Sequence, residues 1–151
     1  MPNYWVAPVN EDNYFVCREF SIFGVKSGQG WVVGKVKPGD ALVIYVPKRG
    51  CKSMCASFVG AYEIVSDWFE EEKPLWPDER VVGKAIYTHR VKIKPIAEGL
   101  VKAEELISKL SFIRNKERWI LYLMGTLGNL RRPIPEEDAE KIINALRKSQ
   151  R

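Results

Sequence analysis

Short strands dominate the pattern of apolar positions along this chain. Tyr4–Val9 alternates aromatic and β-branched residues, and Ala41–Pro47 is a continuous apolar run typical of a buried strand. We also expect an extended segment at Ser21–Val25 and at least one strand within Cys51–Ser66. The residues Lys37–Asp40 (Lys-Pro-Gly-Asp) predict a turn directly before the Ala41–Pro47 strand. Proline presets the φ angle of the second turn position, and glycine supplies the positive φ angle after it.

One later segment shows a clean alternation of apolar and basic residues. Within Arg90–Ile96, the pattern predicts that Val91 and Ile93 face the core, whereas Lys92 and Lys94 face the solvent. This alternation is typical of a strand with one buried face.

Three segments favour helices. Asn10 is a good N-cap, and acidic residues follow it, so we expect a short helix from about Glu11 to Glu19. Lys102–Leu110 has an amphipathic pattern. Acidic residues behind Pro135 predict a final helix that runs to about Lys148.

Two segments have no regular assignment. Asp67–Arg80 carries Trp68, Phe69 and Trp76 among acids and prolines, and long loops of this kind often have a function. Trp119–Leu130 fits a strand or a helix. With no βαβ periodicity, the chain is predicted to be one α+β domain over residues 1–151, a small mixed or antiparallel β-barrel with helices outside it.

Composition places few restrictions on function. The 151 residues carry a net charge of +5 and 46% hydrophobic residues, which favours a globular protein with a moderate preference for polyanions. No apolar run approaches the ~20 residues of a membrane span, and no signal peptide is evident. We therefore expect a cytoplasmic protein without membrane association.

Catalytic and metal-binding patterns are missing from the sequence. His89 is the single histidine, and neither a phosphate loop nor a nucleophile elbow occurs, so we predict no metal, no cofactor and no enzymatic activity. The odd cysteine count argues against a disulfide framework. Cys51 and Cys55 are expected to be two packed thiols on one face of a strand, and Cys17 stands apart.

Aromatic residues near loops and several basic clusters favour a nucleic-acid partner. A base lifted out of its strand needs stacking surfaces and hydrogen bonds to its edge. The basic positions expected at the nucleic-acid backbone are Lys26, Arg49, Arg90, Lys92, Arg114 and Lys116.

Several stretches, taken in order, resemble one family. Tyr4–Val6 followed by Asn10–Asn13 is similar to its first strand and its Asn-x-x-Asn helix start. Further matches are Ile22–Val25, Val36–Asp40, Leu42–Tyr45, Phe58–Ile64, Arg90–Ile96, Leu110–Lys116 with Trp119, and Pro135–Asp138. Over nearly its whole length the chain resembles the EVE domains, small PUA-like barrels related to the YTH readers of methylated adenine in RNA.

The resemblance implies a pocket for a flipped, modified base, with aromatic walls and polar groups near the first helix. The ligand-binding positions that it implies are Asn10, Asn13, Phe23, Gly24, Val25, Tyr45, Lys48, Trp68 and Trp76. Phe23 stands where the YTH readers have tryptophan, so this wall is smaller and offers a weaker face to a methylated or cationic base. Methyladenine, methylcytosine and other modified bases all stay open as ligands.

Two other functions stay open beside a nucleic-acid reader. The acidic stretch between Asp67 and Glu79 would repel phosphates, which favours a module for a small molecule or a protein partner. An RNA-modifying enzyme on the same barrel has less support, because it would need a nucleophile or a metal cluster.

Overall fold

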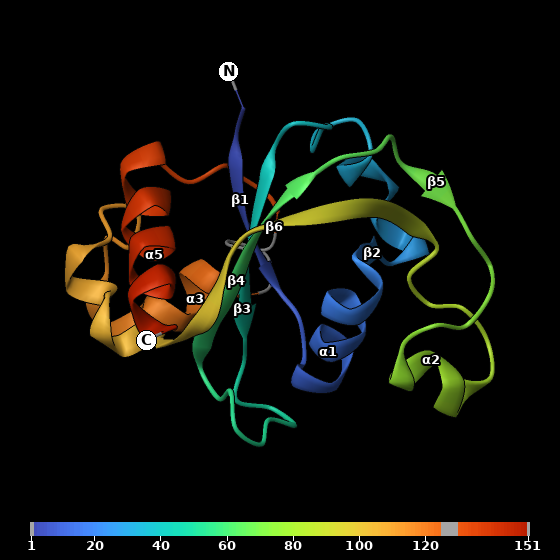
Figure 1. Ribbon diagram of the computed structural model, residues 1–151, viewed down its shortest axis with the longest axis horizontal. Helices are drawn as coiled ribbons and strands as arrows, with labels where there is room; N and C mark the ends of the chain where they lie inside the picture. Colours follow the sequence, from blue (N-terminus) through green and yellow to red (C-terminus); the bar gives the residue numbers. More distant parts are fainter. Residues whose placement is uncertain (1, 125–129, 151) are drawn as a thin grey trace.

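A mixed, curled β-sheet forms the centre of the structure, a computed structural model that describes residues 2–124 and 130–150 (Figure 1). β1 runs parallel to β3, whereas the other pairs are antiparallel. In the described residues the strand order is β1-β3-β4-β6-β2, with β5 paired to β6. The predicted α+β class is confirmed. The strands are β1 (Tyr4–Pro8), β2 (Ile22–Val25), β3 (Ala41–Val46), β4 (Ser57–Ile64), β5 (Phe69–Glu70) and β6 (His89–Lys102).

The long strand β6 joins the two parts of the sheet. Its residues 89–92 pair with β2, and its residues 93–102 pair with β4. The register between β4 and β6 shifts at two places, and such bulges bend and twist a strand. The predicted alternation is confirmed, because Val91 and Ile93 are buried while the lysines between and after them are exposed.

Helices lie on both sides of this sheet (Figure 1). The predicted first and last helices are confirmed, and the last one, α5, packs on β6 and β4. No helix in residues 2–124 and 130–150 has the length and hydropathy needed to cross a membrane. The helices are α1 (Glu11–Phe20), α2 (Pro77–Val82), α3 (Trp119–Leu123) and α5 (Glu136–Ser149), with 3-10 segments η1 (Ser27–Val32), η2 (Ala103–Glu105), η3 (Ile107–Lys109) and η4 (Lys116–Arg118).

Two segments differ from their predicted structure. The predicted helix Lys102–Leu110 is wrong, because β6 continues to Lys102 in register with Ser57, and two 3-10 segments follow. The segment Asp67–Arg80 holds β5 and the start of α2. The ambiguous stretch after Trp119 is helical in α3, and its residues 125–129 lie outside the described part.

The cysteines also differ from the prediction. Cys51 and Cys55 form a disulfide in the loop between β3 and β4, so the interpretation as two packed thiols on a strand is wrong. The carboxylate of Glu11 accepts backbone hydrogen bonds from Lys52, Ser53 and Met54 inside the same loop (2.8–3.2 Å). The loop is therefore fixed both covalently and by the first residue of α1.

Two hydrophobic clusters lie on opposite faces of β3, as the period of two along a strand requires. Val43 and Tyr45 belong to the cluster that α5 covers. Leu42 and Ile44 belong to the second cluster, which also contains Phe23. Tyr45 therefore points away from the side of the sheet on which Phe23 lies.

Candidate functional site

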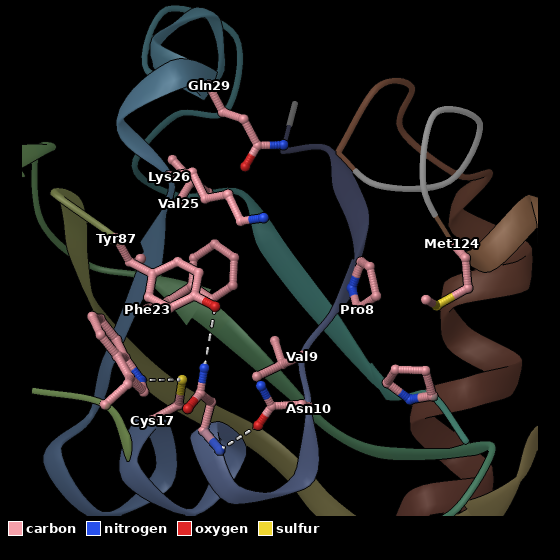
Figure 2. A pocket seen from close by; sticks show the side chains of 14 residues that line it. Pro8, Val9, Asn10, Cys17, Phe23, Val25, Lys26, Gln29, Tyr87 and Met124 are labelled. Atoms are coloured by element: carbon pink, nitrogen blue, oxygen red, sulfur yellow. Dashed lines mark hydrogen bonds between the residues drawn. The ribbon is translucent and has the colours of Figure 1, made fainter. Parts of the chain in front are cut away.

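A cavity of about 260 Å³ opens where the end of β1, the start of α1 and the strand β2 meet (Figure 2). This volume is close to the lower end of the range for small-molecule pockets, ~300–1,000 Å³. Figure 2 shows Phe23 and Tyr87 on one side of the cavity, with Pro8 and Met124 on the opposite side. The site therefore has an aromatic wall and an aliphatic wall.

Asn10 and Asn13 form the polar floor of the cavity. Asn10 caps α1, because its side-chain oxygen accepts the backbone N–H of Asn13 (2.8 Å), which leaves its NH2 group as a donor. The side-chain NH2 of Asn13 donates to Asp78 Oδ2 (3.1 Å) and to the Tyr87 hydroxyl (3.4 Å). These contacts fix the orientation of both amides.

The side-chain oxygen of Asn13 is buried and has no hydrogen-bond partner within residues 2–124 and 130–150. A buried acceptor without a partner costs about 1–3 kcal/mol. A ligand that donates an N–H to this oxygen would remove that cost. Since Asp78 and Tyr87 hold the NH2 group on the other side of the amide, the oxygen is the part of Asn13 left for a ligand.

The aromatic wall consists of Phe23, Trp76 and Tyr87. The rings of Trp76 and Tyr87 meet edge to face, with centroids 5.4 Å apart and an interplanar angle of 75°. Gly24 makes this close packing possible, because a Cβ at that position would lie only 2.7 Å from Trp76 Cη2. The hydroxyl of Tyr87 donates to Asp78 (2.5 Å), and burial together with this carboxylate raises the pKa of Tyr87 above its usual range.

Behind this wall lies a network of buried charges. Glu79 accepts backbone N–H bonds from Leu75, Trp76, Ile86 and Tyr87 (2.7–3.0 Å). Burial opposes its charge, but these four donors outweigh that cost and hold the pKa of Glu79 below its ordinary value. These bonds tie the start of α2 to the chain that leads into β6.

Cys17 contributes a thiol to the site. The indole N–H of Trp76 donates to its Sγ at 3.3 Å. Burial raises the pKa of the Cys17 thiol to about 12, so the thiol stays protonated at neutral pH. A protonated thiol serves as a packing surface and a weak acceptor, not as a nucleophile.

At the opening of the cavity, Lys26 and Gln29 extend from β2 and η1 (Figure 2). Lys26 is exposed and directly follows Val25, the last residue of β2. A cationic and an amide side chain at this rim suit an anionic or polar group next to the bound ligand.

The structure brings together most of the residues that the sequence predicted for the pocket. Those at the cavity are Asn10, Asn13, Phe23, Gly24, Val25 and Trp76. Lys26, predicted for the nucleic-acid backbone, also lines the cavity. Three predicted positions are not among the cavity residues. Tyr45 is buried on the other face of β3, Lys48 is an exposed residue in the loop after it, and Trp68 packs beside the core and donates its indole N–H to the Val36 carbonyl (2.8 Å).

Of the basic residues predicted to contact the nucleic-acid backbone, some are bonded within the protein and others are exposed. Arg90 is corrected, because it is 2% exposed and bonds to Glu79 and to the carbonyls of Tyr87 and Lys73, so it has no surface for a phosphate. Lys116 donates to the Ile107 and Leu110 carbonyls. The remaining exposed positions are Lys26, Arg49, Lys92 and Arg114.

Seven described residues that line the cavity were not predicted from the sequence: Pro8, Val9, Cys17, Gln29, Pro47, Tyr87 and Met124. Cys17 follows Asn13 by one helical turn, so the helix period itself places it on the same face. Tyr87 and Gln29 come from irregular segments, for which no periodic signal exists.

Comparison with known proteins agrees with this architecture. The family model of the EVE domain matches residues 3–145. A UPF0310 protein from Saccharolobus solfataricus is 36% identical over 146 residues, which cover 97% of this chain and 96% of that protein.

Among solved structures, the YTH domain of the Zygosaccharomyces rouxii MRB1 protein, in complex with N6-methyladenosine RNA, is similar with a TM-score of 0.59 at 14% identity. That match covers 97% of this chain and 87% of the other. The YTH domain of Toxoplasma CPSF4, in complex with m6A-modified RNA, reaches 0.64 at 10% identity, covering 97% and 91%. At these identities the likeness shows a shared fold. By the family match and the archaeal relative, the chain belongs to the EVE domain family.

Proposed function

We propose that this protein is a binding module that takes a modified nucleic-acid base, turned out of its strand, into the cavity beside α1. The observation that carries the proposal is a cavity with an aromatic wall whose lining includes Asn13, a residue with a buried side-chain oxygen that has no partner in the described residues. An unpaired base offers both a flat ring, which can stack on the aromatic wall, and an edge with N–H groups, which can donate to the oxygen of Asn13.

The hydrogen-bonding groups of the floor restrict the ligand. The oxygen of Asn13 requires an N–H donor, and the free NH2 of Asn10 requires an acceptor. Every nucleic-acid base has a donor beside an acceptor on its edge, and in adenine and cytosine a methyl group on the exocyclic amine still leaves one N–H. Structures of the same fold that bind N6-methyladenosine RNA support this class of ligand.

Two observations favour binding over catalysis. The thiol of Cys17 is protonated at neutral pH because burial raises its pKa to about 12, so it supplies no thiolate. Among the described residues, no group of three or more histidines, cysteines or acids is arranged to hold a metal ion.

The acidic stretch between Asp67 and Glu79 gives less support to a protein-binding function than its sequence implies. Glu79 is buried, and Asp78 accepts hydrogen bonds from Asn13 and Tyr87. Glu79 and Asp78 bond within the protein, so a partner would meet fewer free carboxylates than the sequence suggests.

The test is a binding screen with pairs of oligonucleotides that differ in one base modification, in RNA and in DNA. We expect one pair to differ in affinity by about ten-fold or more, which corresponds to ~1.4 kcal/mol. Phe23→Leu keeps the apolar volume but removes the aromatic face, so it should lower affinity for the modified member toward that of the unmodified one.

Trp68→Phe is the matched control, since it changes an aromatic residue that is not part of the cavity. It should preserve the discrimination. Equal affinities across every pair, or equal losses in Phe23→Leu for both members of a pair, would contradict the proposal.

A further inference from the structure

An aromatic residue with two cations lies on the surface next to the rim of the cavity. Trp31 is 42% exposed, although it is large and apolar. The ammonium of Lys35 lies 5.4 Å from the centroid of its ring, and the guanidinium carbon of Arg131 lies 5.6 Å from the same centroid. We call Trp31, Lys35 and Arg131 the Trp31 cluster.

The two cations of the Trp31 cluster are brought together by the fold. Lys35 Nζ donates a hydrogen bond to the carbonyl of Arg131 and lies 5.8 Å from the ring of Trp5. Arg131 comes from the segment between α3 and α5, so two parts of the chain distant in sequence meet at this ring.

No carboxylate balances these charges in residues 2–124 and 130–150. The ion pairs described there involve Lys52, His89 and Arg90, and none includes Lys35 or Arg131. Both cations lie against one ring, so an anion bound beside this ring is favourable for both charges. The indole is 42% exposed, which adds apolar surface to the same place.

The Trp31 cluster shares the segment η1 with the proposed base pocket. Trp31 lies on η1, the segment that contributes Gln29 to the cavity, and Lys26 precedes that segment. Figure 2 shows Gln29 and Lys26 on the same side of the opening. A strand whose base enters the cavity would thus have its neighbouring nucleotide near η1.

We infer that the Trp31 cluster binds the nucleotide next to the flipped base in a single-stranded nucleic acid. The indole contacts the neighbouring base, and the cations Lys35 and Arg131 contact its phosphate. This combination of an aromatic face and basic side chains is the common arrangement for single strands, and it is tolerant of base sequence. The inference rests on the proposed function for the kind of partner, a nucleic acid, but it concerns a separate set of residues.

The experiment measures affinity for a short unmodified single-stranded RNA at several salt concentrations. Trp31→Ala should weaken binding by about five-fold or more, the loss expected when one stacked base loses its aromatic partner. Arg131→Gln should weaken binding at low salt and make the slope of log K against log salt shallower by about 0.7, as expected for one lost phosphate contact on a single strand.

Phe15 and Arg18 on α1 provide a matched control pair. Phe15 is 38% exposed, and the guanidinium of Arg18 lies 5.0 Å from its ring, but neither residue belongs to the cavity. Phe15→Ala and Arg18→Gln should leave both the affinity and the salt slope unchanged. If these variants lose as much as Trp31→Ala and Arg131→Gln, the binding is diffuse and the inference is overturned.

The two proposals fail in distinguishable ways. If unmodified RNA binds through the Trp31 cluster but no modified base is preferred, the pocket proposal fails and the inference stands. If a modified base is preferred but Trp31→Ala and Arg131→Gln bind unmodified and modified RNA like the unaltered protein, the inference fails. Absence of binding to every strand at low salt overturns both.

Discussion

Nη2 of Arg90 lies 3.4 Å from Oε2 of Glu79, and both side chains are buried. The guanidinium carbon of Arg90 is 4.9 Å from the centroid of the Trp76 indole. The aromatic wall of the cavity therefore rests on a buried ion pair. Loss of either charge leaves the other one buried without its partner.

Arg90→Met should destabilise the protein by about 3–5 kcal/mol, because it keeps the volume but leaves the carboxylate of Glu79 without its cation. Unfolding in urea at neutral pH measures this loss. Lys92→Met, two residues along β6 and exposed, should stay within about 0.5 kcal/mol of the unaltered protein. A small effect of Arg90→Met would mean that the four backbone donors alone hold the carboxylate.

The stability should depend on pH through Glu11. The hydrogen bond from the backbone N–H of Lys52 lowers the pKa of Glu11, and those from Met54 and Ser53 add to this effect. Burial raises the pKa, but the hydrogen bonds outweigh it, so the pKa stays below its ordinary value of 4.5. A lowered folded-state pKa contributes stability above pH 4.5, and this contribution is lost as pH falls through the folded value. Glu11→Gln should therefore destabilise the protein at neutral pH by about 1.5–3 kcal/mol, and the difference should shrink under acidic conditions.

Urea unfolding over a pH series tests this dependence on Glu11. Glu117→Gln, at an exposed acid in η4, is the control and should change stability little at any pH. A constant difference between Glu11→Gln and the unaltered protein down to strongly acid pH would refute the assignment.

Reduction of the disulfide Cys51–Cys55 should lower the melting temperature modestly. The bridge spans a sequence separation of 4, so its effect on the unfolded chain is smaller than the ~3 kcal/mol of a 15-residue loop. Because Glu11 binds the same loop, reduction and Glu11→Gln should be non-additive. Thermal unfolding with and without a thiol reductant measures both, and the double serine variant should not respond to reductant.

Gly24→Ala should disturb the aromatic wall. A Cβ there would lie 2.7 Å from Trp76 Cη2 and 3.0 Å from Tyr87 Cβ, so the rings must shift, at a cost of about 1–3 kcal/mol. Denaturant unfolding and ligand affinity should both decline. Gly34→Ala is the control, because nothing lies within 4 Å of its Cβ position. Equal stability of the two variants would show that the indole moves freely.

Local signals in the sequence were sufficient for much of the fold. The cap at Asn10 and the turn before Ala41 depend on neighbouring residues, and both are observed where the sequence predicts them. The predicted helix Lys102–Leu110 is wrong: Lys102 still pairs with Ser57 of β4, the N–H of Ala103 bonds to the Ala56 carbonyl, and only two short 3-10 segments follow. The alternation along β6 predicts that Arg90 faces outward, but Trp76 and Glu79 cover its side chain.

The cavity was predictable only in part, because only some of its residues lie in a segment with a local sequence signal. Asn10 and Asn13, which form the polar floor, both lie at the start of α1, so spacing and family resemblance identify them. Its wall combines Phe23 with residues of the irregular segment around α2, where no period fixes which aromatic faces inward. Trp76 enters the cavity wall and Trp68 does not, because Trp68 instead bonds to the Val36 carbonyl.

The position of β1 has a consequence for how the chain folds during synthesis. β1 is made before the strands it joins: it pairs with β3, and its Tyr4 and Val6 carbonyls accept the N–H groups of Ile134 and Leu130. These contacts span most of the chain, so they close late, and a nascent chain lacking its last part has an open edge on β1. Since Pro8 and Asn10 lead directly from β1 into the cavity, a ribosome-bound fragment is expected to gain the binding site only after Leu130 and Ile134 have been made.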